Sequence, residues 1–175
     1  MANKYAFEDM KENMARAMMK DLDISTKVAI EVANFIRGRS VENAKMVLNR
    51  VLEYKQAVPY KRFPNGVGHR SGKGMAAGRY PQKASQYFID LIEQAEANAQ
   101  TKGLSSDLKI VHLAAQGAAK QWHYGRQRRR EMKRTHIEIV VEEQEKKKEA
   151  KKESKSKGSK ETTKPKEQKK TEEKQ

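Results

Sequence analysis

The chain has 175 residues, enough for one ordinary domain and an appendage, and 35% of them are charged while only 6% are aromatic. No apolar run is long enough to cross a membrane, no leader with a basic start and an apolar run opens the chain, and the absence of cysteine excludes disulfides and cysteine-ligated metal sites. The formal net charge of +15 points to a polyanionic partner. We therefore expect a cytoplasmic protein with one modest core and no cofactor.

The first two segments differ in how clearly they are patterned. Residues 14–22 show no decisive period, and a helix is slightly favoured there. Residues 26–37 place apolar side chains on one face of a helix, with Ser25 as a plausible N-cap and Gly38 as the stop. We expect that apolar face to belong to the core.

Two further helices are expected before residue 103. Ser40 can cap the second helix, which cannot extend far because Pro59 follows. Pro81 suits the first position of the third helix, which runs toward Gly103. In both segments apolar residues recur at helical spacing, so each helix should present one face to the core.

A glycine-rich segment, residues 58–80, separates the second and third helices. It holds five of the ten glycines, and residues 55–83 carry a net charge of +7 with no acidic residue. The spacing from Gly68 to Lys73 is one residue too short for a phosphate-binding P-loop, and Gly74 stands where a magnesium-binding Ser or Thr is needed. A loop whose backbone closely approaches a sugar-phosphate chain fits this composition better, and a merely solvated loop is the alternative.

Beyond Gly103 the pattern becomes that of strands. Residues 108–113 and 135–141 are rich in β-branched side chains and partly alternate in polarity. If the two segments pair and the pairing extends between them, residues 108–142 form a hairpin on the order of 50 Å long. A small helical body is only about 30 Å across, so this hairpin should protrude.

The expected tip of the hairpin, residues 120–134, carries a net charge of +6. It also contains the run Trp122, His123 and Tyr124. Flat side chains beside arginines suit stacking on unpaired bases and contact with phosphates. A solvated basic turn without a ligand is the alternative.

The last segment, residues 145–175, contains 13 Lys and 7 Glu and no Val, Ile, Leu, Met or aromatic residue. Such a composition cannot offset the entropy of ordering the chain. We therefore expect a disordered Lys/Glu-rich tail that follows a single domain of residues 1–144 and is dispensable for its fold.

Catalysis finds little support in the residues. The histidines His69, His112, His123 and His136 lack the spacing of metal ligands. The glutamates of the helices, Glu31 among them, are expected on a solvated face. We expect neither an enzyme nor a metal site.

Six runs of residues occur in an order that carries a family resemblance. They are Ile24-Ser-Thr-Lys, Phe35-Ile-Arg-Gly-Arg-Ser-Val-Glu-Asn-Ala, Gly66-Val-Gly-His-Arg, Ala77-Gly-Arg-Tyr-Pro-Gln-Lys-Ala, Ala95-Glu-Ala-Asn-Ala and Thr135-His-Ile-Glu-Ile-Val-Val. Over about residues 5–142 the chain resembles the universal large-subunit ribosomal protein family L twenty-two, in its archaeal form, which is called L seventeen in eukaryotes.

The resemblance implies an α+β fold, with a three-helix body on a small antiparallel sheet and a long protruding β-hairpin. It makes residues 14–22 a strand at the base of that hairpin. It also implies a structural role in the large ribosomal subunit. There the body lies near the polypeptide exit, the hairpin lines the tunnel wall, and the protein helps the subunit to assemble.

The implied partners are large-subunit rRNA at several domains, neighbouring ribosomal proteins and the nascent polypeptide, without a membrane. A DNA- or chromatin-binding protein is the alternative, although Lys and Arg do not cluster on the helix faces as a helix that reads DNA requires. The candidate rRNA-binding residues come from family positions and from the two basic segments. They are Lys27, Arg37, Arg39, Lys61, Arg62, His69, Arg70, Lys73, Arg79, Lys120, Trp122, His123, Tyr124, Arg126, Arg128, Arg129, Arg130, Lys133 and Arg134.

Overall fold

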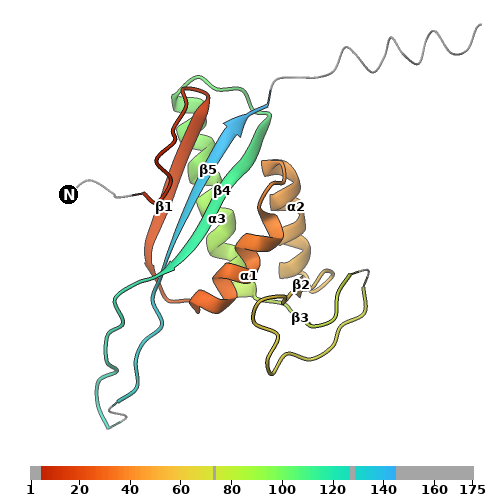
Figure 1. Ribbon diagram of the computed structural model, residues 1–175, viewed down its shortest axis with the longest axis vertical. Coiled ribbons are helices and arrows are strands. Elements are labelled where there is room, and N and C mark those ends of the chain that lie inside the picture. Colours follow the sequence, from red (N-terminus) through yellow and green to blue (C-terminus); the bar gives the residue numbers. More distant parts are fainter. Residues whose placement is uncertain (1–4, 73, 127–128, 145–175) are drawn as a thin grey trace, which may run out of the picture. The chain divides into compact units, whose positions relative to one another are not determined.

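Strands and helices are interleaved along the described part of the chain, which comprises residues 5–72, 74–126 and 129–144 of the computed structural model. In order they are β1 (Met14–Leu22), α1 (Thr26–Ile36), α2 (Val41–Leu52), β2 (Val58–Pro59), β3 (Gly78–Arg79), α3 (Gln82–Thr101), β4 (Leu108–Gly117) and β5 (Thr135–Glu143). An antiparallel sheet has the order β1-β5-β4, and β2 pairs with β3 in a separate short ladder. The predicted α+β class is confirmed (Figure 1). The predicted tail, residues 145–175, lies outside the described residues, as do Lys73 and Arg128.

The strand at the edge of the sheet, β1, shows where local pattern alone misleads. Met14–Leu22 pairs antiparallel with β5, from Met14 opposite Glu142 to Leu22 opposite Thr135. This confirms the strand that the resemblance implies, and the slight preference for a helix was wrong. The partner strand lies more than a hundred residues away, so no local period in the sequence could reveal the pairing.

The three predicted helices are confirmed in the described residues, but their ends differ from the predictions in detail. Ser25 and Ser40 occupy the N-cap positions, yet neither side chain makes a capping hydrogen bond. Pro81 is the N-cap of α3, so the helix begins one residue later than predicted. Gly38 follows α1 with a φ of 77°, and its N–H donates to Ile110 O, which joins the end of α1 to β4.

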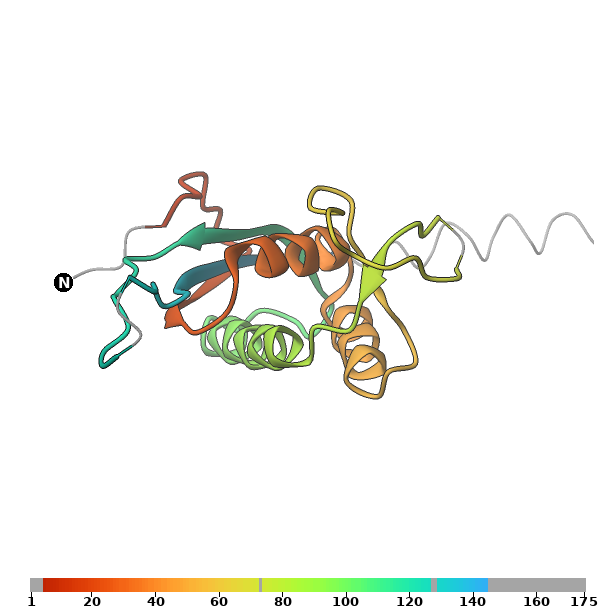
Figure 2. The same ribbon diagram turned by 90° about the horizontal axis from the view of Figure 1, so that it is seen from below.

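The core lies between one face of the sheet and the helices. Fully buried side chains from all sides meet there, among them Ile36, Leu48, Phe88, Leu91, Ile92, Ile110, Leu113, Ile137 and Ile139. The sheet contributes alternate side chains of its strands, because these point to the same face. Register shifts between Met19 and Leu22 and between Ile110 and His112 interrupt the alternation in β1 and β4. We call residues 60–77, which connect β2 to β3, the insert. In both views the insert and the far end of the β4–β5 hairpin lie on opposite sides of α1 (Figures 1 and 2).

The other face of the sheet is covered in part by the N-terminal segment, residues 5–13. The buried Glu138 of β5 accepts hydrogen bonds from the N–H of Ala6, at 3.0 Å, and pairs with His112 Nε2 at 2.9 Å. The ring of Phe7 lies against that of His112, with 5.2 Å between centroids. None of the helices in the described residues combines the length and the apolar character that crossing a membrane requires.

Candidate nucleic-acid interface

The predicted hairpin is confirmed, and its two arms stay paired beyond the sheet. The regular ladder of β4 and β5 ends where Gly117 faces Thr135. Further out, the N–H of Ala118 donates to Arg134 O at 3.1 Å, Met132 N–H to Gln121 O at 2.7 Å, and His123 N–H to Arg130 O at 2.7 Å. The arms therefore leave the body together (Figure 1). We call residues 118–134 the hairpin tip.

Aromatic surface is exposed on the hairpin tip. Trp122 is 63% exposed and Tyr124 is 80% exposed, although large aromatic side chains normally contribute to a core or an interface. The rings of His123 and Tyr124 are stacked, with centroids 4.8 Å apart and 17° between their planes. Flat side chains presented in this way can accept an unpaired base on a face.

The hairpin tip also carries exposed basic side chains. Arg126, Arg129 and Lys133 are exposed, and Lys120 forms an ion pair with Glu131, the acidic residue of the tip, at 3.2 Å. A groove runs along the return arm and is lined by Asp23, His123, Arg130, Glu131, Met132, Lys133 and Arg134. The tip thus combines stacking surfaces with positive charge, which are the two features that single-stranded nucleic acid requires.

The insert between β2 and β3 begins on a buried carboxylate. Glu31 of α1 is 1% exposed, and its carboxylate accepts the N–H of Lys61 at 3.2 Å, of Arg62 at 2.8 Å and of Phe63 at 2.7 Å. The expectation of a solvated Glu31 was therefore wrong. Because these donors are backbone groups, the side chains of Lys61 and Arg62 stay exposed while their backbone is held.

Contacts within the insert give it a defined conformation. His69 forms an isolated bridge with Ala77, and Arg70 N–H donates to Ala76 O at 3.1 Å. Arg79 Nη2 donates to Gly66 O at 2.6 Å. These hydrogen bonds hold the backbone of the insert. The ring of Phe63 lies under two cations, Lys27 at 5.7 Å and Arg62 at 5.5 Å.

Aromatic rings also order the start and the end of the insert. Arg70 lies over the ring of Tyr80 at 5.3 Å, and Arg79 lies 5.9 Å from the ring of Tyr60. Tyr60 is buried, and this burial raises the pKa of its hydroxyl. The phenol stays neutral at physiological pH and packs as part of the core.

Two of the candidate residues, Arg37 and Arg39, make hydrogen bonds within the body. The guanidinium of Arg37 donates twice to Leu113 O, from Nε at 3.2 Å and from Nη2 at 2.6 Å, and so ties the end of α1 to β4. Arg39 donates from Nε to Phe35 O at 2.9 Å and lies over the ring of Phe35. Their family positions alone do not reveal these contacts.

The structure thus gathers the described candidate residues into separate groups. The insert and Lys27 form one group, the hairpin tip forms a second, and Arg37 and Arg39 lie together at the end of α1. Sequence reasoning missed Glu31, although one signal for it exists. It lies three residues after Val28 and four before Phe35, so an acid stands in an apolar stripe. Among the described residues, no group of three His, Asp or Glu side chains is placed to hold a metal ion.

Comparison of the sequence with known proteins identifies its family. The family model of ribosomal protein L22p/L17e matches residues 17–142. Proteins named large ribosomal subunit protein uL22 are similar to the chain in several archaea. The protein of Ignicoccus hospitalis is 43% identical over 144 residues, which cover 77% of this chain and 91% of that protein. The protein of Picrophilus torridus is 46% identical over 63% of this chain and 72% of its own, and that of Archaeoglobus fulgidus is 40% identical over 79% and 94%. With the family model covering well over half of its length, the chain belongs to the ribosomal protein L22p/L17e family.

Proposed function

We propose that this chain is a structural constituent of the large ribosomal subunit in the cytoplasm, and that it binds large-subunit rRNA through the hairpin tip and the insert. One observation carries the proposal. A paired hairpin leaves the body, and its tip exposes Trp122, Tyr124, Arg126 and Arg129, which do not belong to the core. Exposed aromatic surface next to arginines is stabilised by bases and phosphates.

The arrangement of the two basic surfaces supports contact with more than one rRNA segment. The insert and the hairpin tip lie on opposite sides of α1, so one RNA strand at the insert leaves the tip free for another (Figure 2). A protein of this shape holds separate RNA segments in a fixed relation. This is the physical basis for a role in subunit assembly, and no catalytic group is involved.

The finer placement follows from the family resemblance. In this proposal the body lies near the polypeptide exit on the subunit surface, and the hairpin extends between rRNA segments to line the tunnel wall. Neighbouring ribosomal proteins contact the body, and the nascent polypeptide passes the hairpin. The candidate rRNA-binding residues retain their assignment, Lys73 and Arg128 included, although these two lie outside the described residues.

Sedimentation and salt titration test the proposal. On a sucrose gradient the tagged protein is expected to migrate with large ribosomal subunits, and migration with chromatin would overturn it. The isolated protein should bind rRNA fragments with an affinity that falls steeply with salt, each phosphate contact adding about 0.7–0.9 to the log–log slope. A slope near zero would remove the electrostatic basis of the binding.

A further inference from the structure

The root of the hairpin is a mechanical weak point. The hairpin tip is joined to the sheet where Gly117 and Leu22 both face Thr135, and β1 ends there. A two-stranded ribbon has little stability of its own in water. Without further contacts, such a ribbon would swing about its root, and its basic side chains would have no fixed direction.

The end of β1 and the short connection to α1 contact the hairpin at this root. Thr135 is fully buried, and its Oγ1 donates to Ile24 O at 2.9 Å while the hydroxyl of Thr26 lies 3.0 Å away. Arg134 donates from Nη1 to Asp21 O at 3.3 Å, and Asp21 N–H donates to His136 Nδ1 at 3.1 Å. Three consecutive residues of the return arm are thus attached to residues 21–24, which comprise the last two residues of β1 and the first two of the connection.

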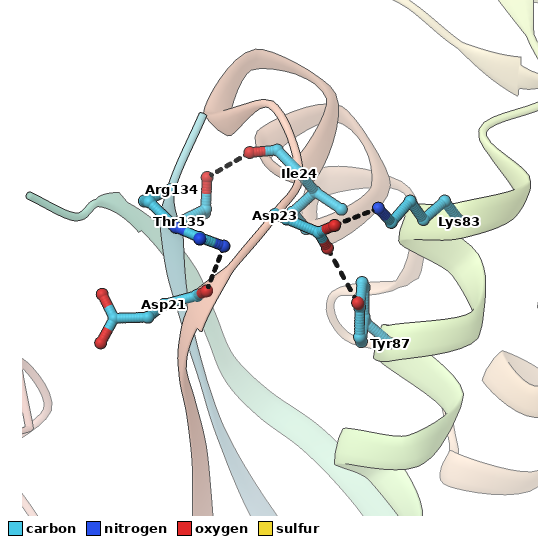
Figure 3. Close-up of polar contacts among 7 residues, drawn as sticks. All are labelled: Asp21, Asp23, Ile24, Lys83, Tyr87, Arg134 and Thr135. Atoms are coloured by element: carbon cyan, nitrogen blue, oxygen red, sulfur yellow. Dashed lines mark hydrogen bonds and ion pairs between the residues drawn. The ribbon is translucent and has the colours of Figure 1, made fainter. Parts of the chain in front are cut away.

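The same segment, residues 21–24, is also attached to α3 of the body. The Asp23 carboxylate accepts hydrogen bonds from Lys83 Nζ and from the hydroxyl of Tyr87, the latter at 2.8 Å, and both donors lie on α3. Figure 3 shows the carboxylate of Asp23 directed toward α3, while Arg134 reaches Asp21 at the end of β1 and Thr135 reaches Ile24. The contacts to Asp23 lower the pKa of its carboxyl, Lys83 being the larger cause, so the carboxylate is charged at neutral pH.

We propose that residues 21–24, which we call the hairpin clamp, fix the direction in which the hairpin tip leaves the body, with Asp23 and Thr135 as positioning residues for RNA binding. The clamp joins β5 to α3, two elements that otherwise meet through the core, by polar contacts on both sides of one short segment. Rigid attachment lowers the entropy that is lost when the tip docks on RNA. The importance of this direction rests on the proposed RNA-binding function, whereas the clamp itself can be tested without RNA.

The chain has no cysteine, so two spin labels can be attached at chosen positions without background. Gln94 on α3 and Gln121 on the hairpin are both exposed and suit replacement by cysteine in the full-length protein. Pulsed electron paramagnetic resonance then measures the distribution of distances between the two labels, one on the body and one on the hairpin. In the free protein with an intact clamp, we expect one narrow distribution.

Two variants loosen the clamp in different ways. Asp23→Asn weakens the exposed contacts to α3, and Thr135→Val removes the hydroxyl that donates to Ile24 while keeping a β-branched side chain of similar size. Each should broaden or shift the distance distribution while circular dichroism stays that of a folded protein. Thr135→Ser keeps the hydroxyl and should restore the narrow distribution. Should Thr135→Val fail to fold, Asp23→Asn by itself still tests the clamp, because the Asp23 side chain is 46% exposed.

Matched controls separate the clamp from general destabilisation. Glu53→Gln removes an exposed ion pair with Lys55, and Thr101→Val removes a hydroxyl that donates to Ala97 O at the end of α3. Both should leave the distances unchanged. An unchanged distribution in Asp23→Asn and in folded Thr135→Val would overturn the clamp.

On RNA, hydroxyl-radical protection by the tip should weaken in these two variants while protection by the insert persists. If the unaltered protein protected no RNA, the proposed function would fail and the distances would still decide the clamp.

Discussion

Arg62 and Glu31 are joined by a 2.8 Å hydrogen bond from the backbone N–H of the first to the buried carboxylate of the second. The same carboxylate binds the N–H groups of Lys61 and Phe63. A side chain of α1 therefore sets the path of the insert at its first residues. The side chains of Lys61 and Arg62 stay exposed while the buried carboxylate of Glu31 holds their backbone.

Replacing Glu31 with Gln should destabilise the protein by about 1–3 kcal/mol, because a buried amide NH₂ group then faces backbone donors that lose an acceptor. Urea unfolding followed by circular dichroism measures this change. The matched control is Glu93→Gln, whose exposed side chain makes only a loose 3.9 Å contact with Lys45, and it should stay within about 0.5 kcal/mol of the parent. Equal stability of the two variants would contradict the role assigned to Glu31.

Deleting residues 121–133 should leave the body folded and weaken assembly of the large subunit. The buried side chains of β4, β5 and the helices all remain, so the apolar burial that stabilises the body is retained. Circular dichroism of the free variant and its incorporation into reconstituted subunits measure the two effects. Replacing Arg128, Arg129 and Arg130 with Gln should produce a milder assembly defect, since charge is lost while the ribbon remains. Unfolding of the free deletion variant would count against the protruding hairpin.

The Asp23 carboxyl should titrate below its ordinary value of 3.8, because Lys83 and then Tyr87 donate hydrogen bonds to its charged form. A carboxyl whose pKa is lower in the folded state stabilises that state above the unfolded pKa, and the contribution disappears as the pH falls through the folded pKa. The stabilisation from the ionised Asp23 carboxylate is thus present above about pH 4 and is lost as the pH falls through the lowered pKa. NMR detection of the Asp23 side-chain carbon measures the midpoint. Lys83→Met should move it upward, and an unmoved midpoint would show that Lys83 is not the cause.

Gly78 and Gly117 should respond differently to a methyl group. A Cβ on Gly78 would lie 3.2 Å from Val58 O and 3.3 Å from Ala57 Cβ, in the short ladder that closes the insert. Gly78→Ala should therefore cost about 1–3 kcal/mol by overpacking. At Gly117 nothing lies within 4 Å of the added atom, so Gly117→Ala should change stability by less than about 1 kcal/mol. Thermal unfolding of the two variants compares them, and a harmless Gly78→Ala would show that the insert adapts freely.

Local sequence was sufficient to predict the elements that pack on the rest of the fold through one apolar face. The spacing of apolar residues in Thr26–Ile36, Val41–Leu52 and Gln82–Thr101 predicts these helices within about a turn. The β-branched runs at 108–113 and 135–141 predict β4 and β5, although both strands continue further. Charge and aromatic composition select the hairpin tip and the insert as candidate RNA-binding surfaces, and this selection remains a prediction.

The sequence by itself therefore determined the helices, the hairpin and the concentration of basic charge, because each depends on the periodicity or composition of one continuous segment. Only the tertiary structure decided that Glu31 is buried beneath the insert and that Asp23 lies between α3 and the hairpin root. It also confirmed the strand Met14–Leu22, which the family resemblance implied and the local pattern did not. In each of these cases the deciding partner is distant in sequence: β5 for the strand, residues 61–63 for Glu31, and Lys83 and Tyr87 for Asp23. A hydrogen bond between such groups depends on where the fold brings their atoms, and no period along the chain encodes that position.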